Sequence, residues 1–247
     1  MPQSFDHEAL VERFFETLIN GDRPAARAVV DDVVNAGYTP DEVITELFWP
    51  TRELFEKLYR TDQLSQISYQ YASRLLRVLV DQNASRLARH TFESPVGSGQ
   101  NRLVLAYCGP SDAEELGAQM AVDLLEAGGF TVRFAGGGVP ADEIHAQVQD
   151  LKPHALLMFC SAAADLPGIR QLFDTLREIN ACPNTQFVVG GGVFNRAEGL
   201  AEEIGADLSA TDPLELVDLM IAKPAARAVK TPSLAPAPRR AEQRKAA

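Results

Sequence analysis

The sequence has few cysteines and no long hydrophobic run. Its three cysteines, Cys108, Cys160 and Cys182, form no CxxC pair and no zinc-binding spacing. We expect them to be small buried side chains in a reducing compartment, with reactive thiols as the alternative. No apolar stretch reaches the roughly 18 residues of a membrane span, and the N-terminus opens acidic and polar, unlike a signal peptide. These absences predict a cytoplasmic protein without a membrane segment.

Basic residues are scarce outside the C-terminal end. The chain carries 23 Lys and Arg against 34 Asp and Glu, a net charge of −11. Residues 223–247 hold seven of the basic residues and one acid, so residues 1–222 carry a net charge of −17. Such an acidic body excludes direct nucleic-acid binding. The Pro- and Ala-rich segment 223–247 is predicted to be disordered, either as a solvated tail or as a tether for an acidic partner.

Residues 1–91 are predicted to form a helical bundle, followed by a linker at 92–101. Thr39, Pro40 and Glu42 form a capping box with proline at the first helical position. Pro50 lacks the N–H that would bond back to Glu46, so we expect a kink or break there. A long helix is expected from about residue 64 to residue 90. Its inward apolar stripe is predicted to be Ile67, Tyr71, Leu75, Val78, Leu79 and Leu87.

From residue 102 onward, short apolar strands alternate with helices. Strands are expected at 102–108, 130–135, 154–160, 185–189 and 206–210, and helices at 112–127, 141–151, 165–180, 195–204 and 212–221. Five such units predict an α/β fold: a flavodoxin- or Rossmann-like, doubly wound, five-stranded parallel sheet over 102–222, preceded by the N-terminal bundle. No GxGxxG fingerprint and no P-loop follows a strand. Ligands of such sheets bind at the carboxyl ends of the strands.

Three of these strand ends carry a motif. Asp112-Ala113-Glu114-Glu115-Leu116-Gly117 follows the first strand, Ser161-Ala162-Ala163 the third, and Gly190-Gly191-Gly192 the fourth. Their order and spacing resemble the cobalamin-binding domain family, which carries Asp-x-His-x-x-Gly, Ser-x-Leu and Gly-Gly at these places. The resemblance covers about residues 5–222, because a helical bundle precedes the sheet in methionine-synthase-type corrinoid modules. Cobalamin-dependent light sensors and photosynthesis antirepressors share this layout.

The resemblance implies a set of cofactor-binding residues at the sheet and on the cap. The implied set is Asp112, Glu114, Gly117, Ser161, Ala163, Gly190, Gly191 and Gly192 at the sheet, with Tyr59, Tyr69 and Gln70 on the cap. The three cap residues stand where light sensors carry Trp, Glu and His. The glycines and small residues suit either a flat ligand or tight backbone packing. Trp49, the only tryptophan, is more readily a core residue than a cofactor cover.

One departure from the family pattern concerns the cobalt ligand. Glu114 stands at the position of the cobalt-ligating histidine, and a carboxylate is a weaker ligand for cobalt than an imidazole. Ser111 and Glu114 also form a capping box, which gives Glu114 a structural alternative. If cobalamin binds, we expect its own benzimidazole or water at the lower coordination position.

The sequence therefore predicts a non-enzymatic cobalamin-binding-fold sensor or regulator. It would hold cobalamin, or heme as an alternative, between cap and sheet without a metal ligand of its own, and signal through a protein partner. Two alternatives remain open: a corrinoid carrier for a separate methyltransferase, and an interaction scaffold without a cofactor. Glu114 argues against the carrier. The retained serine, glycines and cap aromatics argue for binding.

Overall fold

The structure is a computed structural model that describes residues 6–93, 102–109, 115–180 and 182–227. The N-terminal part is helical, as predicted. Its elements are α1 (His7–Ile19), α2 (Arg23–Asn35), α3 (Pro40–Val43), the π-helical η1 (Ile44–Phe48), α4 (Trp49–Arg60) and α5 (Gln66–Glu93). The capping box at Thr39 and Glu42 is present, with both reciprocal hydrogen bonds. The long helix α5 continues into the segment predicted as a linker, and residues 94–101 lie outside the described part of the chain.

The break expected at Pro50 takes the form of a widened helical turn. Pro50 is the second residue of α4 and offers no N–H to the carbonyl of Glu46. The preceding residues, Ile44–Phe48, adopt π-helical geometry, which absorbs the missing hydrogen bond without ending the helix. The helix axis therefore continues from α3 through α4, and Trp49 stands at the junction.

The predicted inward stripe of α5 holds only beyond its first two turns. Leu75, Leu79 and Leu87 are buried, whereas Ile67 is 60% and Tyr71 46% exposed. Tyr71 packs beside Gly21 in the turn after α1, a contact that does not bury its side chain. These two residues are corrections to the predicted core.

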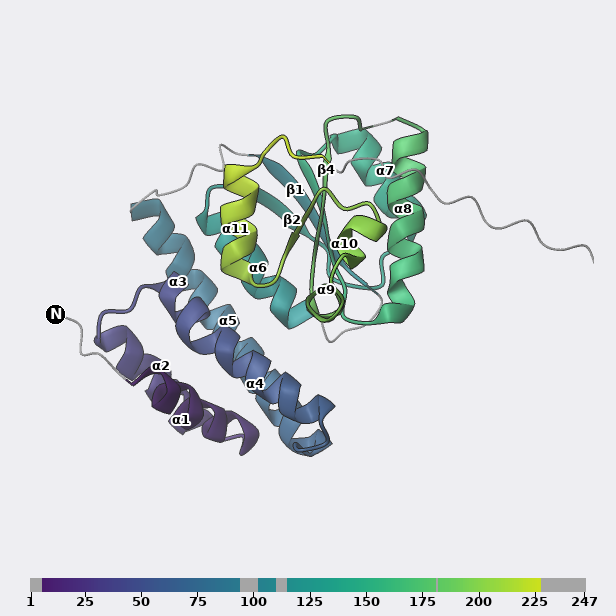
Figure 1. The fold of residues 1–247 in the computed structure, drawn as a ribbon. Coiled ribbons are helices and arrows are strands. Elements are labelled where there is room, and N and C mark those ends of the chain that lie inside the picture. The colour runs from purple at the N-terminus through teal and green to yellow at the C-terminus, as the bar shows by residue number, and fades with distance from the viewer. Residues whose placement is uncertain (1–5, 94–101, 110–114, 181, 228–247) are drawn as a thin grey trace, which may run out of the picture.

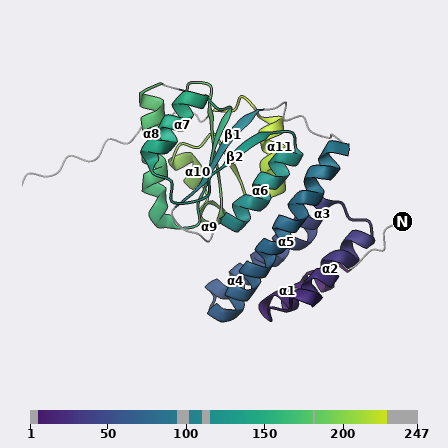
Figure 2. The ribbon, with the colours of Figure 1, turned by 180° about the vertical axis from the view of Figure 1, so that it is seen from behind.

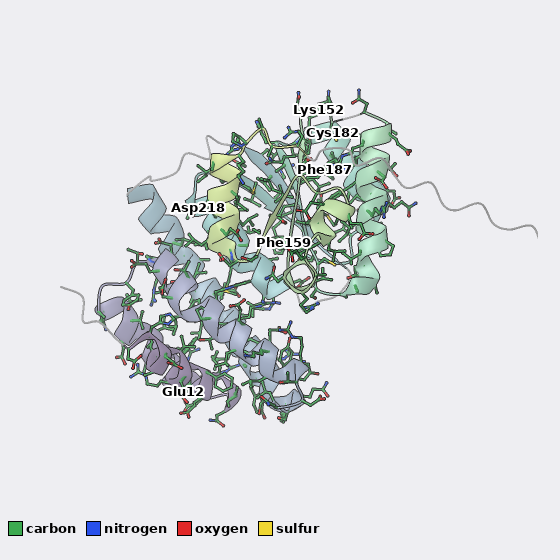
Figure 3. The ribbon with its side chains drawn as sticks, viewed as in Figure 1. Glu12, Lys152, Phe159, Cys182, Phe187 and Asp218 are labelled. Carbon is green, nitrogen blue, oxygen red and sulfur yellow. The ribbon has the colours of Figure 1, made fainter. Side chains whose placement is uncertain are left out.

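A five-stranded parallel sheet follows in the order β2-β1-β3-β4-β5, which confirms the predicted fold class. Its strands are β1 (Leu103–Cys108), β2 (Thr131–Phe134), β3 (Ala155–Phe159), β4 (Gln186–Gly190) and β5 (Leu208–Ala210). The strand order reverses direction between β1 and β3, so the topological switch point lies at their carboxyl ends. Phe159 marks this edge beside the bundle, whereas Lys152 and Cys182 lie at the opposite edge (Figure 3).

Helices cover both faces of the sheet (Figures 1 and 2). They are α6 (Glu115–Ala127), α7 (Ala141–Leu151), the 3₁₀ turn η3 (Ala163–Asp165), α8 (Leu166–Glu178), α9 (Gly192–Arg196), α10 (Leu200–Glu203) and α11 (Pro213–Ala222). The single helix expected over 195–204 is wrong, because extended backbone at Ala197 and a left-handed Gly199 (φ 78°) separate α9 from α10. Asn195 lies within α9 and donates its side-chain amide to the Thr211 carbonyl, 2.7 Å away.

The two faces of the sheet belong to two apolar cores. Alternate strand residues such as Leu105 and Leu156 pack under α7 and α8, while Val104 and Leu157 pack under α6 and α11. The core beneath α6 continues into the bundle, where Phe14 and Phe55 belong to the same cluster. Helix α6 is therefore packed between sheet and bundle, which holds the bundle against one face (Figure 1). All three cysteines are buried, as predicted, and none of them forms a disulfide.

Candidate cofactor site between bundle and sheet

The carboxyl edge of the sheet is built from closely packed backbone. Gly190 ends β4, and Gly191 adopts a left-handed φ of 109° that other residues rarely tolerate. A Cβ on Gly191 would collide with the carbonyl oxygen of Cys160 and lie 2.8 Å from its nitrogen. Backbone packing alone thus accounts for Gly191, whereas a Cβ on Gly190 would make ordinary contact with the Phe159 ring at 3.4 Å.

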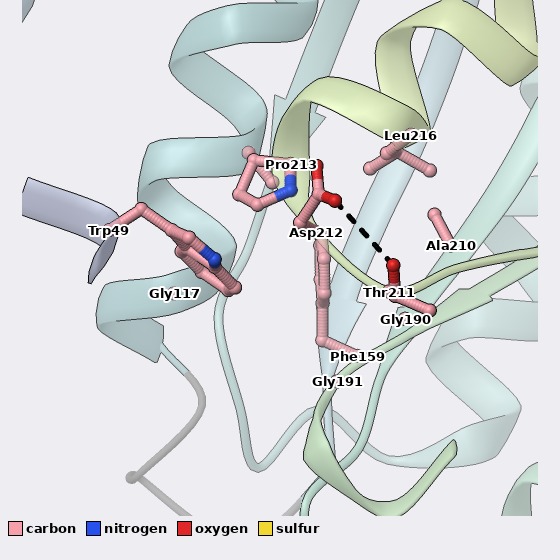
Figure 4. Close-up of a pocket in the computed structure, with 11 residues that line it drawn as sticks. Trp49, Gly117, Phe159, Gly190, Gly191, Ala210, Thr211, Asp212, Pro213 and Leu216 are labelled. Atoms are coloured by element: carbon pink, nitrogen blue, oxygen red, sulfur yellow. Dashed lines mark hydrogen bonds between the residues drawn. The ribbon is translucent and has the colours of Figure 1, made fainter. Parts of the chain in front are cut away.

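A narrow slot opens beside these glycines between α6 and α11 (Figure 4). It holds about 20 Å³, room for about one water molecule. Small or apolar side chains line it: Gly117, Ala121, Phe159, Gly190, Gly191, Ala210, Pro213 and Leu216, with Trp49, Thr211 and Asp212 at its rim. Gly117, Gly190 and Gly191 of the predicted set therefore come together at this slot.

Trp49 reaches this slot from the bundle. Its ring is only partly buried and lines the slot with Gly117 of α6 (Figure 4). The expectation that Trp49 is mainly a core residue is therefore incomplete, because its ring also faces the candidate site. The guanidinium of Arg52 lies 5.3 Å from the centroid of the Trp49 ring. The Arg52 Cζ would also be 3.0 Å from a Cβ on Gly117, so the missing side chain at 117 makes room for this arginine.

Tyr59 and Tyr69 form one aromatic unit on the cap. Their rings stack with centroids 4.2 Å apart, and Phe55 meets Tyr69 edge-on at 5.7 Å. The Tyr69 hydroxyl donates a 2.8 Å hydrogen bond to Glu56. Burial, followed by the nearby Glu56 carboxylate, raises the pKa of Tyr69 to about 12. This phenol stays a neutral donor at physiological pH.

Gln70 and Arg77 lie seven residues apart on α5 and so share one face of that helix. Gln70 is exposed, and Arg77 approaches Glu115 of α6 at 3.8 Å. Glu115 also accepts a 3.2 Å hydrogen bond from the backbone N–H of Gly137, in the loop after β2. Glu115 thus connects the cap, the first turn of α6 and the β2 loop.

The remaining predicted site residues are placed differently. Asp112 and Glu114 lie outside the described residues. Ser161, Ala163 and Gly192 are at the same edge of the sheet but do not line the slot. The carbonyl of Ser161 accepts a 2.6 Å hydrogen bond from Arg196, and Ala163 begins the η3 turn, where it is exposed.

A wider cleft of about 590 Å³ adjoins the slot between η1, α4 and the start of α11. Carboxylates of Glu46, Glu53 and Asp212 line it together with Asn195. Burial raises the pKa of Glu53, Arg52 lowers it, and Asp212 raises it further. The open cleft beside the slot thus carries acidic groups.

Sequence reasoning missed Arg52, Glu115 and Asp123. Asp123 is 6% exposed on α6, and burial raises the pKa of its carboxyl to about 7. A polar residue among the apolar positions of α6 was a possible signal for Asp123. Arg52 and Glu115 carry no such signal, because both belong to ordinary polar stretches of helix.

Known proteins resemble both parts of the chain. The family model described as "B12 binding domain" matches residues 102–218. Monomethylamine corrinoid protein 1 of Methanosarcina mazei is 18% identical over 211 residues, covering 85% of this chain and 94% of that protein. Dimethylamine corrinoid protein 1 of Methanosarcina acetivorans is 25% identical over 125 residues, covering 50% of this chain and 58% of that protein.

The fold as a whole is also found in a solved structure. The monomethylamine corrinoid protein of Methanosarcina barkeri superposes with a TM-score of 0.72 at 16% identity, covering 87% of this chain and 99% of that protein. That similarity extends over bundle and sheet together. The match of the family model to residues 102–218 confirms the resemblance drawn from the strand-end motifs.

Proposed function

We propose that this protein is a corrinoid carrier that presents its cofactor to a separate methyltransferase. The observation that carries this proposal is the slot of small residues beneath Trp49, at the sheet edge where parallel α/β folds bind ligands. The similarity to methylamine corrinoid proteins, which spans 85% of this chain in one case, supports it. The comparisons favour this alternative over the sensor or regulator that the sequence alone suggested.

The slot residues fit the terminal base of a corrinoid's nucleotide tail. Gly117 and Gly190 have no side chain to fill the slot, and Ala121 and Ala210 have only a methyl group. A flat aromatic base is much larger than one water, so its entry would require the side chains that line the slot, such as Phe159 and Leu216, to move apart. The bound corrinoid would supply a cobalt centre able to carry a methyl group.

The cap would exclude water from the other side of the cofactor. The rings of Tyr59 and Tyr69 stack on each other, and the Tyr69 hydroxyl is already bonded to Glu56. Trp49, also from the cap, lines the slot itself. A protein partner must reach the cofactor past this cap, so the contact of the cap with α6 through Arg52 and Arg77 would have to be reversible.

Reconstitution tests the proposal. The purified chain is incubated separately with hydroxocobalamin and heme, desalted, and examined by absorbance. We expect cobalamin to remain bound and heme to be lost. Ala210→Leu fills the slot and should abolish retention. The matched control is Ala206→Leu, because Ala206 and Ala210 are both 6% exposed but Ala206 belongs to the core on the other face.

Each other outcome has a defined meaning. Equal retention by both leucine variants would show that the base does not use the slot. Loss of both tetrapyrroles by the unmodified chain would favour the cofactor-free scaffold. A change of elution volume after illumination of the methylcobalamin-loaded chain would favour the sensor, whereas a carrier should elute unchanged.

A further inference from the structure

The wide cleft beside the slot is acidic and partly apolar. Glu46, Glu53 and Asp212 contribute carboxylates to its lining, and Leu214 contributes an apolar side chain that is 50% exposed. The Glu46 carboxylate lies 3.3 Å from His7. In the part of the chain that the structure describes, neither Glu53 nor Asp212 has a cationic side chain within 4.0 Å. The cleft therefore suits a positively charged segment and repels an anion.

The chain carries such a segment beyond its last described residue. Residues 228–247 hold five basic residues and one acid, which gives a net charge of +4, whereas residues 1–222 carry −17. The basic residues are Lys230, Arg239, Arg240, Arg244 and Lys245. Arginine pairs with carboxylates through two parallel N–H donors, and such charge-assisted bonds are stronger than neutral ones. Residues 228–247 are called the basic segment below.

The basic segment is long enough to reach the cleft. The described chain ends at Arg227, which bonds to the loop before β4. The cleft is lined by the first residues of α11, and the ten residues of this helix span about 15 Å. Residues 228–238 span up to about 36 Å when extended. Arg239 and Arg240 can therefore reach the cleft along the exposed side of α11, where Asp218 lies (Figure 3).

We propose that the basic segment binds in the acidic cleft, with Arg239 and Arg240 paired to its carboxylates, and covers the Trp49 side of the candidate site. Tethering gives the segment an effective concentration in the millimolar range, so a weak contact is enough for occupancy. A separate basic protein would have to bind from its much lower concentration in solution. The contact requires no bound corrinoid and is therefore independent of the proposed function.

Trp49 makes this contact measurable, because it is the only tryptophan of the chain and lines the cleft. Quenching of its fluorescence by acrylamide, which is neutral, reports the accessibility of the ring in the purified full chain. The basic-segment variant carries Arg239→Gln and Arg240→Gln. The matched control carries Arg13→Gln and Arg86→Gln, which remove two charges from arginines that pair with exposed carboxylates of the bundle. Urea midpoints establish that both variants fold.

We expect the quenching constant of the basic-segment variant to be about 2-fold that of the unmodified chain and of the control. Raising the salt concentration from about 0.01 M to about 1 M shortens the Debye length from about 30 Å to about 3 Å. This change should raise the constant of the unmodified chain to that of the basic-segment variant, which should itself stay constant. Glu53→Gln should raise the constant in part, whereas Glu12→Gln, on the exposed side of α1, should leave it unchanged.

Four results would overturn the contact. The first is equal quenching of the unmodified chain and the basic-segment variant at both salt concentrations. The second is an equal effect of the control variant, which would show a general effect of charge. Protection of Trp49 that is lost on dilution would assign the cleft to the basic segment of a second copy. Protection that appears only when a separate basic peptide is added would assign the cleft to another protein.

Discussion

The Glu115 carboxylate accepts a 3.2 Å hydrogen bond from the backbone N–H of Gly137, which joins the start of α6 to the loop after β2. Glu115→Ala should lower the free energy of unfolding by about 1–2 kcal/mol, because a partly buried N–H loses its acceptor. Urea melts measure this change. Arg77→Ala should cost less than about 0.5 kcal/mol, since its 3.8 Å contact with Glu115 is largely solvated. A larger effect for Arg77 than for Glu115 would contradict the assignment.

Asp123 should make stability depend on pH. Burial, together with the charges of Glu126 and of Asp81 on α5 and against the hydrogen bond from Gln119, raises its pKa from 3.8 to about 7 in the folded chain. The folded state therefore binds the proton more tightly than the unfolded state, and stability falls as pH rises from about 4 to about 7. Asp123→Asn should remove this dependence and be the more stable protein at pH 8, by on the order of a few kcal/mol.

Urea midpoints at pH 5 and pH 8 check the sign of this effect. Asp81→Asn is the control, because Asp81 is exposed and acts only through its charge. It should shift the midpoint slightly and leave the pH dependence in place. A wild-type protein that is equally stable at both pH values would show that the Asp123 carboxyl is hydrated in solution.

The Tyr69 phenol should be the last tyrosine to ionise among the five in the chain. Its pKa of about 12 reflects burial and the acceptor Glu56. An absorbance titration, with circular dichroism to follow unfolding, should show one phenolate that appears only near that pH or on unfolding. Tyr69→Phe should remove this step, while Tyr59→Phe should retain it. A native protein in which every tyrosine ionises near pH 10 would contradict the burial of the Tyr69–Glu56 pair.

The sheet could be predicted closely because its strands carry continuous apolar runs. All residues of β1 after Leu103 and every residue of β3 and β4 are buried, and a strand covered on both faces requires such a run. The region after β4 could not be predicted, because the break between α9 and α10 depends on Gly199 and on the bond from Asn195 to Thr211, which joins distant residues. The apolar spacing typical of a helix was thus present over 195–204, although the helix there is interrupted.

The candidate site was predictable only where glycine marks a close approach. Gly117 was noticed because glycine inside a helix is energetically costly. Gly190 and Gly191 were noticed because a run of glycines indicates backbone that passes close to another group. Arg52 and Trp49 were not assigned to the site, since their role depends on how the bundle rests on α6. That arrangement follows from a core shared across both parts, and no local pattern in the sequence encodes it. The predicted boundaries of bundle, linker, sheet domain and tail stay predictions.

The lower coordination position of a bound corrinoid gives the last prediction. Position 114 carries Glu where the family pattern has its cobalt-ligating histidine. If the terminal base lies in the slot, it cannot serve as the lower ligand. No histidine stands at position 114 to supply an imidazole, and the carboxylate there is a weak substitute. Electron paramagnetic resonance of the Co(II) form should then show no nitrogen hyperfine splitting. Glu114→His should introduce the splitting, and ¹⁵N-histidine labelling should change its pattern. Splitting in the unmodified protein that labelling leaves unaltered would mean that the base stays on cobalt, outside the slot.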